Sequence, residues 1–255
     1  MDRFERLIKS LAGAFEVAAE GMLVIVLAFV AGRQGILDAL GAIDDVREAL
    51  EEDARDWVED TLPEVYAEGM RTALLSEQTP DVDPNSLQQG VHDETLDLFI
   101  EDLIGQLAAA TQNISEQAKA SIREAGRRNL AASLDKGTNA REQAAEMERE
   151  LREKGVKFVD RRGRRWGTRE YAEMVLRTHT IEVSNEANLN TSAELGSPGV
   201  SVHDGGPGDV DEPCKVANGQ KWSLSYARAN RTEHPNCRRA FAPLPSTWEG
   251  TLDRE

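Results

Sequence analysis

The chain has 255 residues, with 46 Asp and Glu against 30 Lys and Arg, which gives a formal net charge of −16 at pH 7. This acidity excludes a protein that attracts nucleic acid through its overall field, because the phosphates would be repelled. Two cysteines in a chain of this length exclude a disulfide framework. The charged first nine residues lead us to expect no secretory signal peptide.

The charge is unevenly distributed along the chain. Residues 1–110 hold 24 Asp and Glu against 7 Lys and Arg, whereas the remainder holds 22 against 23. We therefore predict an acidic, mainly helical region over residues 1–150, with helices near 2–31, 37–75, 87–110, 115–133 and 139–154. Residues 76–86 ("SEQTPDVDPNS") contain two prolines and no periodicity, so they are predicted to be a linker.

The most apolar stretch is "GMLVIVLAFVAG", residues 21–32. As a helix it rises about 18 Å, which is short of the roughly 30 Å hydrocarbon core of a membrane. We predict a helix buried in a bundle or against another subunit, and we consider a membrane span less favoured. The predicted partner contacts are Met22, Leu23, Val24, Ile25, Val26, Leu27 and Phe29.

The pattern changes after residue 150, and residues 151–245 are predicted to form a small, loop-rich α+β module followed by a tail at 246–255. "VKFVDRRGRRWGT" indicates a β-hairpin with Gly163 in its turn. A helix is expected over residues 169–189, and short strands over 200–203 and 240–244. The fold class is therefore α+β, a long mainly helical N-terminal part with a small C-terminal module.

Four side chains of the C-terminal third are of the types that bind a structural zinc ion. Thiolate and imidazole are the ligands that tetrahedral Zn²⁺ prefers, and the set is His203, Cys214, His234 and Cys237. Buried free thiols and a disulfide between the two cysteines are the alternatives. A Cys237/His234 nucleophile pair is a further alternative, although no glycine loop that would form an oxyanion hole adjoins Cys237.

A basic run accompanies the predicted hairpin. Guanidinium groups at its tip would contact phosphates, and an adjacent Trp would stack on a base. The candidate nucleic-acid contacts are Lys157, Arg161, Arg162, Arg164, Arg165 and Trp166. A surface hairpin that pairs with an acidic protein surface explains the same residues equally well.

Several of these segments resemble the phage minor capsid protein 2 family, which is related to the Mu F-like head morphogenesis proteins. They are "GVKFVDRRGRRWGTREYAEMVLRTHTIEVSNEANLN", "VSVHDGGPGDVDEPC", "NGQKWSLS" and "HPNCRRAFAPLP", and the resemblance covers about residues 150–245. A weaker likeness lies in "DWVEDTLPEVYAEGMRTA". Where the family usually has C-x-x-C, Cys214 is followed by "KVA", so the resemblance implies that His203 completes any zinc site.

The resemblance implies a structural minor head protein of a tailed bacteriophage, and no enzyme. It would lie in the virion, in the capsid and portal region, after assembly in the host cytoplasm. Its implied partners are portal and capsid proteins and packaged double-stranded DNA, and several copies would take part in the assembly. It would support head morphogenesis and DNA packaging or ejection. The alternative is a phage-delivered effector or toxin, or a Cys/His enzyme that uses Cys237.

Overall fold

The chain forms two compact units, each assembled from separate segments. The structure is a computed structural model, and it describes residues 2–76, 89–134, 140–204 and 212–255. The helical unit comprises Asp2–Trp57 and Ile104–Glu173, and the mixed unit comprises Val58–Leu103 and Met174–Glu255. Three long helices have residues in both units. The predicted domain boundary near residue 150 divides the chain in a different way from these two units, and it stays a prediction.

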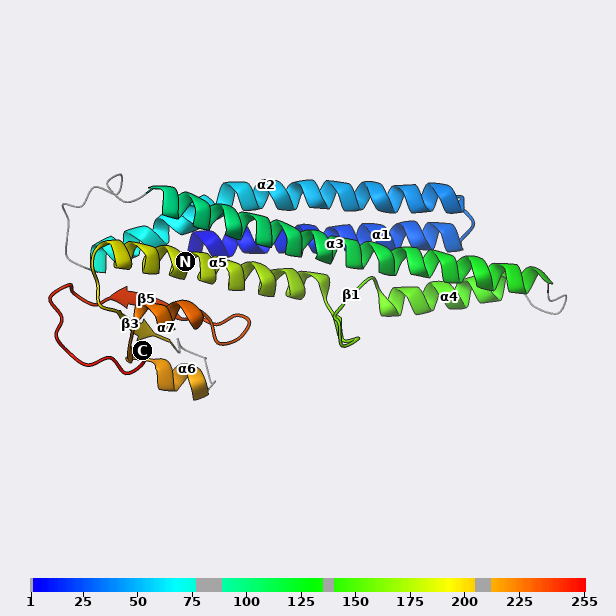
Figure 1. The fold of residues 1–255 in the computed structure, drawn as a ribbon. Coiled ribbons are helices and arrows are strands. Elements are labelled where there is room, and N and C mark those ends of the chain that lie inside the picture. The colour runs from blue at the N-terminus through cyan, green and yellow to red at the C-terminus, as the bar shows by residue number, and fades with distance from the viewer. Residues whose placement is uncertain (1, 77–88, 135–139, 205–211) are drawn as a thin grey trace. The chain divides into compact units, whose positions relative to one another are not determined.

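Four helices make up most of the first 154 residues (Figure 1): α1 (Asp2–Val30), α2 (Ile36–Ser76), α3 (Gln89–Leu134) and α4 (Ala140–Lys154). The predictions for α1, α2 and α4 are confirmed. Pro63 lies inside α2 without ending it. The expected linker at 76–86 lies outside the described residues, apart from Ser76, the last residue of α2.

The two helices expected over 87–110 and 115–133 are one continuous helix, and this prediction was wrong. Thr111 and Asn113 lie between the two expected ranges, and both are weak helix formers. The Thr111 hydroxyl donates hydrogen bonds to the carbonyls of Leu107 and Ala108 in the preceding turn. Ala110 and Ile114 are buried on either side, so packing maintains the helix where propensity alone would end it.

Helix α1 buries one face and leaves apolar side chains on the other. Ile8, Leu11, Phe15, Met22 and Val26 are buried, whereas Val17 and Val24 are 68% and 64% exposed. By length and composition the described part of the chain has one helix able to cross a membrane, and it is this one, over Arg3–Val30. Core helices pass the same test, so the burial of the first face is the more specific observation.

Contacts between helices hold the helical unit together. Val30 of α1, Ala125 of α3 and Met147 of α4 form a buried apolar cluster. The Trp57 indole N–H donates a 3.0 Å hydrogen bond to the carbonyl oxygen of Leu7. These contacts come from α1, α2, α3 and α4, so each helix of the unit has a partner for its apolar side.

The mixed unit carries a three-stranded antiparallel sheet in the order β4-β3-β5. Its strands are β3 (Val200–His203), β4 (Lys221–Trp222) and β5 (Ala240–Pro243). The helices of the unit include α5 (Thr168–Glu194), α6 (Glu212–Ala217) and α7 (Leu224–Ala229). The predictions for α5, β3 and β5 are confirmed, and the sequence interpretation missed β4, α6 and α7.

A small core fixes the sheet of the mixed unit. Its buried members come from α5, the three strands, α6 and α7, and they are Leu189, Val200, Val202, Ala217, Trp222, Ala227 and Phe241. Residues of the predicted tail also join the sheet, because Ser223 N–H donates to the Arg254 carbonyl at 2.8 Å. The last residues therefore follow β4 along its free edge.

Within the mixed unit, α2 and α5 approach each other closely at Gly69. A Cβ atom placed on Gly69 would lie 2.2 Å from the Ser184 carbonyl oxygen and 2.9 Å from the Ala187 Cβ. Because real Cβ atoms do not come so near to backbone oxygen, only glycine allows this helix spacing.

Candidate metal centre and basic hairpin

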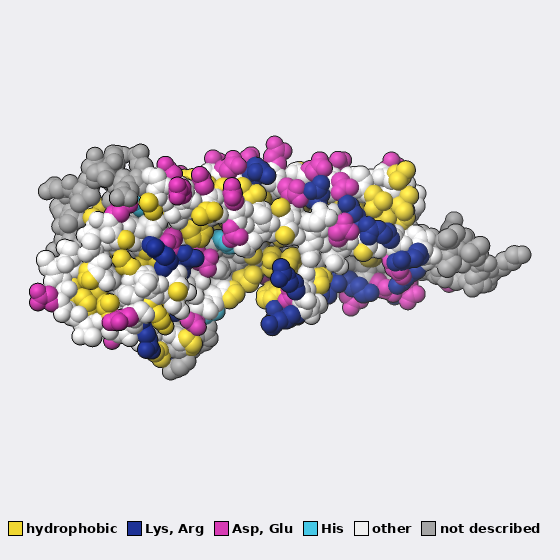
Figure 2. Space-filling model, viewed as in Figure 1, with side chains coloured by type: hydrophobic (Ala, Val, Ile, Leu, Met, Phe, Trp, Pro, Cys, Tyr) yellow, Lys and Arg dark blue, Asp and Glu magenta, His cyan; other side chains and the backbone are white. Residues whose placement is uncertain are grey.

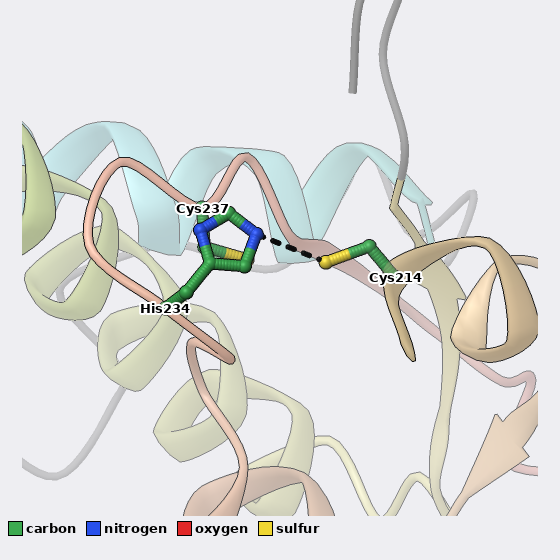
Figure 3. Close-up of side chains that lie close together, drawn as sticks. All are labelled: Cys214, His234 and Cys237. Carbon is green, nitrogen blue, oxygen red and sulfur yellow. Dashed lines mark hydrogen bonds between the residues drawn. The ribbon is translucent and has the colours of Figure 1, made fainter. Parts of the chain in front are cut away.

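Three of the four predicted zinc ligands lie together in the mixed unit. The side chains of Cys214, His234 and Cys237 point toward one another (Figure 3), and their ligand atoms all lie within 4.8 Å of each other. Cys214 Sγ is 3.3 Å from His234 Nε2. Both cysteines are fully buried and they do not form a disulfide.

Two local structures bring these side chains together. Cys214 lies in the short helix α6, whereas His234 and Cys237 stand at the two ends of one tight turn. The Cys237 N–H donates to the His234 carbonyl at 3.0 Å, and Asn236 takes a positive φ of 64°. Asn is among the few residues other than glycine that tolerate this left-handed conformation, so "HPNC" has the turn chemistry that the site needs.

The His234 ring is oriented as in a metal ligand. Its Nδ1 lies 2.9 Å from the Pro235 carbonyl oxygen, which accepts a hydrogen bond from Nδ1–H. That bond leaves the Nε2 lone pair facing the Cys214 sulfur. Ligating histidines commonly donate their second ring N–H to a carbonyl or carboxylate in this way. Two thiols and one such imidazole fit a zinc ion through three protein ligands, and among the described residues no further His, Cys, Asp or Glu joins this group.

His203 is not a member of the cluster, and Asp204 lies closer to it. Along β3, Val200 and Val202 are buried while His203 is exposed. Successive side chains of a strand point to opposite faces, so Asp204, with the parity of Val200 and Val202, is buried. Its Oδ1 is 3.9 Å from the Cys237 Sγ. Of the predicted ligand set, the structure thus brings together three residues and leaves His203 apart.

A buried ion pair lies beside the cluster. The Arg239 guanidinium donates from Nε to Asp204 Oδ2 at 2.7 Å and from Nη1 to the Asn230 carbonyl at 2.7 Å, and it stacks over the Trp222 ring. Burial by itself lowers the pKa of Arg239, but the hydrogen bond to Asp204 and the charge of that carboxylate raise the pKa above its ordinary value. Arg239 therefore places a permanent positive charge next to sulfur.

Polar side chains of α5 bind the loops around the cluster, and sequence analysis missed these residues. The Asn185 amide donates to the carbonyls of Arg231 and Arg239, and the Glu186 carboxylate pairs with Arg228 and Arg231. Three asparagines occur within residues 185–190, although Asn is a poor former of helix interiors. These three asparagines were the sequence signal that could have indicated buried hydrogen bonds made by this helix.

The predicted basic hairpin is confirmed in the helical unit. β1 (Phe158–Val159) pairs antiparallel with β2 (Arg165–Trp166), with Phe158 opposite Trp166. The turn contains Gly163 at φ 76°. The Asp160 carboxylate accepts hydrogen bonds from the backbone N–H groups of Arg162 and Arg164. Figure 2 shows Lys and Arg side chains gathered in this part of the molecule, in contrast with the acidic side chains along α2.

Asp160 organises the side chains of the hairpin as well as its turn. It accepts from the Arg164 guanidinium at 2.6 Å and from the Trp166 indole at 3.2 Å. Burial raises the pKa of Asp160, but hydrogen bonds from Arg164, Trp166 and the Arg162 N–H outweigh it and hold the pKa well below its ordinary value. Arg164 also lies over the Trp166 ring. Of the predicted nucleic-acid contacts, these two are thus engaged inside the hairpin.

The predicted partner contacts on α1 divide between core and surface. Met22, Val26 and Leu27 are buried inside the helical unit, and Val24 is the most exposed of the set. Leu23, Ile25 and Phe29 are half-buried. Contact with a partner through the exposed side of α1 stays a prediction, and Val17 belongs to that same side.

The chain combines long helices, a small sheet and a cluster of two buried cysteines and a histidine. The sequence model of the phage minor capsid protein 2 family matches residues 34–206, more than half of the chain, and the chain belongs to this family. Neither a search of curated proteins nor a search of solved structures gives a match. Membership supports a structural role in the phage capsid and a place in the virion.

The range of the match differs from the range of the resemblance. The match begins at residue 34, so it includes α2, where the weaker likeness lay, and α3, to which the resemblance did not extend. It includes the hairpin and β3 but ends before Cys214, His234 and Cys237. The case for a metal therefore rests on the geometry of these three side chains and not on the family match.

Proposed function

We propose that this chain is a minor head protein that joins the capsid next to the portal, in several copies, and supports head morphogenesis and the packaging or ejection of DNA. Family membership over residues 34–206 is the observation that carries the proposal. The apolar positions that α1 leaves exposed, Val17 and Val24, suit packing inside a larger assembly.

The test is the composition of the assembled particle. Purified virions and purified portal complexes are analysed by quantitative mass spectrometry, and the chain is expected in both, at several copies per particle. Cells infected with a phage that lacks this gene are expected to yield fewer DNA-filled heads than cells infected with the wild-type phage. Absence of the chain from purified virions would sink the proposal, and presence in capsids without cross-links to the portal would remove the portal part of it.

The second part of the proposal concerns zinc. Cys214, His234 and Cys237 would hold one zinc ion, and the ion would fix α6 and the "HPNC" turn against each other. A small sheet with a core this limited gains folding stability from such a cross-link. Bound there, the ion would cross-link α6 and the "HPNC" turn through three protein ligands, and its fourth coordination position would be left to water or another group.

Metal content and stability test the zinc proposal together. Protein purified without added chelator is expected to contain one zinc per chain by elemental analysis. Cys237→Ser is expected to lose the metal and to unfold at a lower temperature, whereas the control His203→Ala keeps both because His203 lies outside the cluster. Zinc bound equally by the wild type and the Cys237→Ser variant would contradict the assigned ligands.

A thiol enzyme is the second candidate, since Cys214 Sγ is 3.3 Å from His234 Nε2. The pair differs from the expected one, in which Cys237 was the nucleophile. Both sulfurs are fully buried, whereas a reactive cysteine needs access to its substrate. Iodoacetamide distinguishes the candidates: a catalytic Cys214 is alkylated rapidly in the native protein, and a zinc-bound one is protected until a chelator is added.

A further inference from the structure

The β1–β2 hairpin presents positive charge that the chain itself does not neutralise. Residues 156–167 carry five cationic side chains and one carboxylate, that of Asp160. Within the described ranges, the side chains of Lys157, Arg161 and Arg162 make no ion pair or hydrogen bond. Arg161 and Arg162 are exposed at the turn. Arg165 reaches only two backbone carbonyls, each at 3.4 Å.

Other arginines of the helical unit, in contrast, form ion pairs with glutamates. Arg123, Arg127 and Arg128 of α3 pair with glutamates, and so do Arg149 and Arg152 of α4. Most of these pairs join residues three or four positions apart on one helix, which is the spacing that brings side chains together. Among the described residues, Arg161 and Arg162 of the hairpin thus lack the acidic partner that these helical arginines have.

Contacts with α3 and α5 also hold the hairpin in place. The Asn113 side chain of α3 accepts from the Val159 N–H at 3.0 Å and donates to the Val159 carbonyl at 2.9 Å, so it pairs with β1 like the edge of a strand. Phe158 stacks on Tyr171 of α5 with ring centroids 3.6 Å apart. Strands of two residues would not persist alone, and these contacts fix the direction in which the tip projects.

Two features identify the chemistry of the partner. Residues 160–165 are "DRRGRR", without one apolar side chain that a protein interface would bury, whereas contacts to phosphates need none. Single-strand binders stack bases on aromatic rings, but the Trp166 ring is half-buried and lies under Arg164, and its N–H is bonded to Asp160. These features favour a polyphosphate backbone over both a protein and a single strand.

We propose that Arg161 and Arg162, with Lys157 and Arg165 beside them, contact the phosphate backbone of double-stranded DNA without reading its sequence. The inference deepens the proposed function, on which it rests for the presence of DNA. Because the chain as a whole carries −16, its acidic remainder repels DNA and confines the contact to the hairpin tip. The binding is consequently weak, local and strongly dependent on salt.

The test measures affinity of the full chain for a short DNA duplex of mixed sequence by fluorescence anisotropy over a series of salt concentrations. Arg161→Ala with Arg162→Ala is expected to weaken binding on the order of tenfold at low salt. It is also expected to reduce the slope of log affinity against log salt by about 1.8, at about 0.9 for each lost phosphate contact. Arg161→Lys with Arg162→Lys retains the charge and is expected to keep the slope.

The matched control is Arg149→Ala with Arg152→Ala, which changes the net charge equally but removes arginines already paired with glutamates. It is expected to leave duplex affinity nearly unchanged. Equal losses in the two double variants would overturn the inference, because only net charge would then matter. It is also overturned if the hairpin variant keeps its duplex affinity but no longer enters phage heads, which indicates a protein contact. Neither result would contradict the proposed role in the phage head, because that role is tested by the presence of the chain in virions.

Discussion

Arg239 and Asp204 form an ion pair with 1% and 0% of their side chains exposed, and the two residues lie on different segments of the mixed unit. The pair joins the start of β5 to the end of β3, next to the sulfur of Cys237. Two opposite charges removed from water stabilise a fold only when their geometry and remaining hydrogen bonds are satisfied. Arg239 meets this condition through the Asn230 carbonyl and the Trp222 ring.

Breaking this pair from one side should be severely destabilising. Arg239→Met leaves the Asp204 carboxylate buried without its cation, and we expect a loss of about 3–5 kcal/mol in the free energy of unfolding. The measurement is urea denaturation followed by tryptophan fluorescence. Asp204→Leu combined with Arg239→Met removes both charges and should recover much of the loss. A double variant whose loss equals the sum of the two single losses would show that the partners act independently.

Gly69 should tolerate no side chain. In Gly69→Ala the new Cβ would lie 2.2 Å from the Ser184 carbonyl, so α2 and α5 must separate, with a loss of roughly 1–3 kcal/mol in the free energy of unfolding. Gly105→Ala is the control, because Gly105 is an exposed position of α3 with nothing within 4 Å. There alanine should stabilise by about 0.5–1 kcal/mol. Thermal denaturation should therefore shift in opposite directions for the two variants.

Asn113 should control the order of the hairpin. Asn113→Ala removes both hydrogen bonds to Val159, and leaving such part-buried backbone groups unpaired costs about 1–3 kcal/mol. We expect the Val159 amide to exchange with deuterium much faster while the helices keep their protection. Gln112→Ala, whose exposed side chain hydrogen-bonds Glu116 on the same helix, should leave this exchange unchanged. Unaltered protection at Val159 in the Asn113 variant would refute the anchoring role.

His179 should make stability depend on pH. Burial lowers the pKa of His179 below the ordinary 6.5, although Glu182 and Asp102 raise it in part. The unfolded chain therefore binds a proton more readily, so this contribution is complete above about pH 6.5 and is lost as the pH falls through the lower, folded-state pKa. The free energy of unfolding, measured between pH 7.5 and 5, should fall less steeply in His179→Gln.

The long helices and the hairpin could be predicted because their signals are local. Apolar side chains recur at helical spacing in α1 and α2, and "DRRGR" between alternating residues has the chemistry of a turn. The break expected near Thr111 failed because tertiary burial of Ala110 and Ile114 outweighs a weak local propensity. The short elements α6, β4 and α7 are too brief to carry a periodic signal.

The sequence by itself determined which kinds of side chain are present, namely two thiols and a few imidazoles in the last third and a cluster of arginines in one turn. Only the tertiary structure decided which of them meet. His203 and Asp204 are neighbours in the chain, yet the alternation of a strand turns one to solvent and the other toward the cysteines. Likewise, Arg161 and Arg164 look equivalent in sequence, and the position of a single carboxylate, Asp160, separates the engaged arginine from the available one.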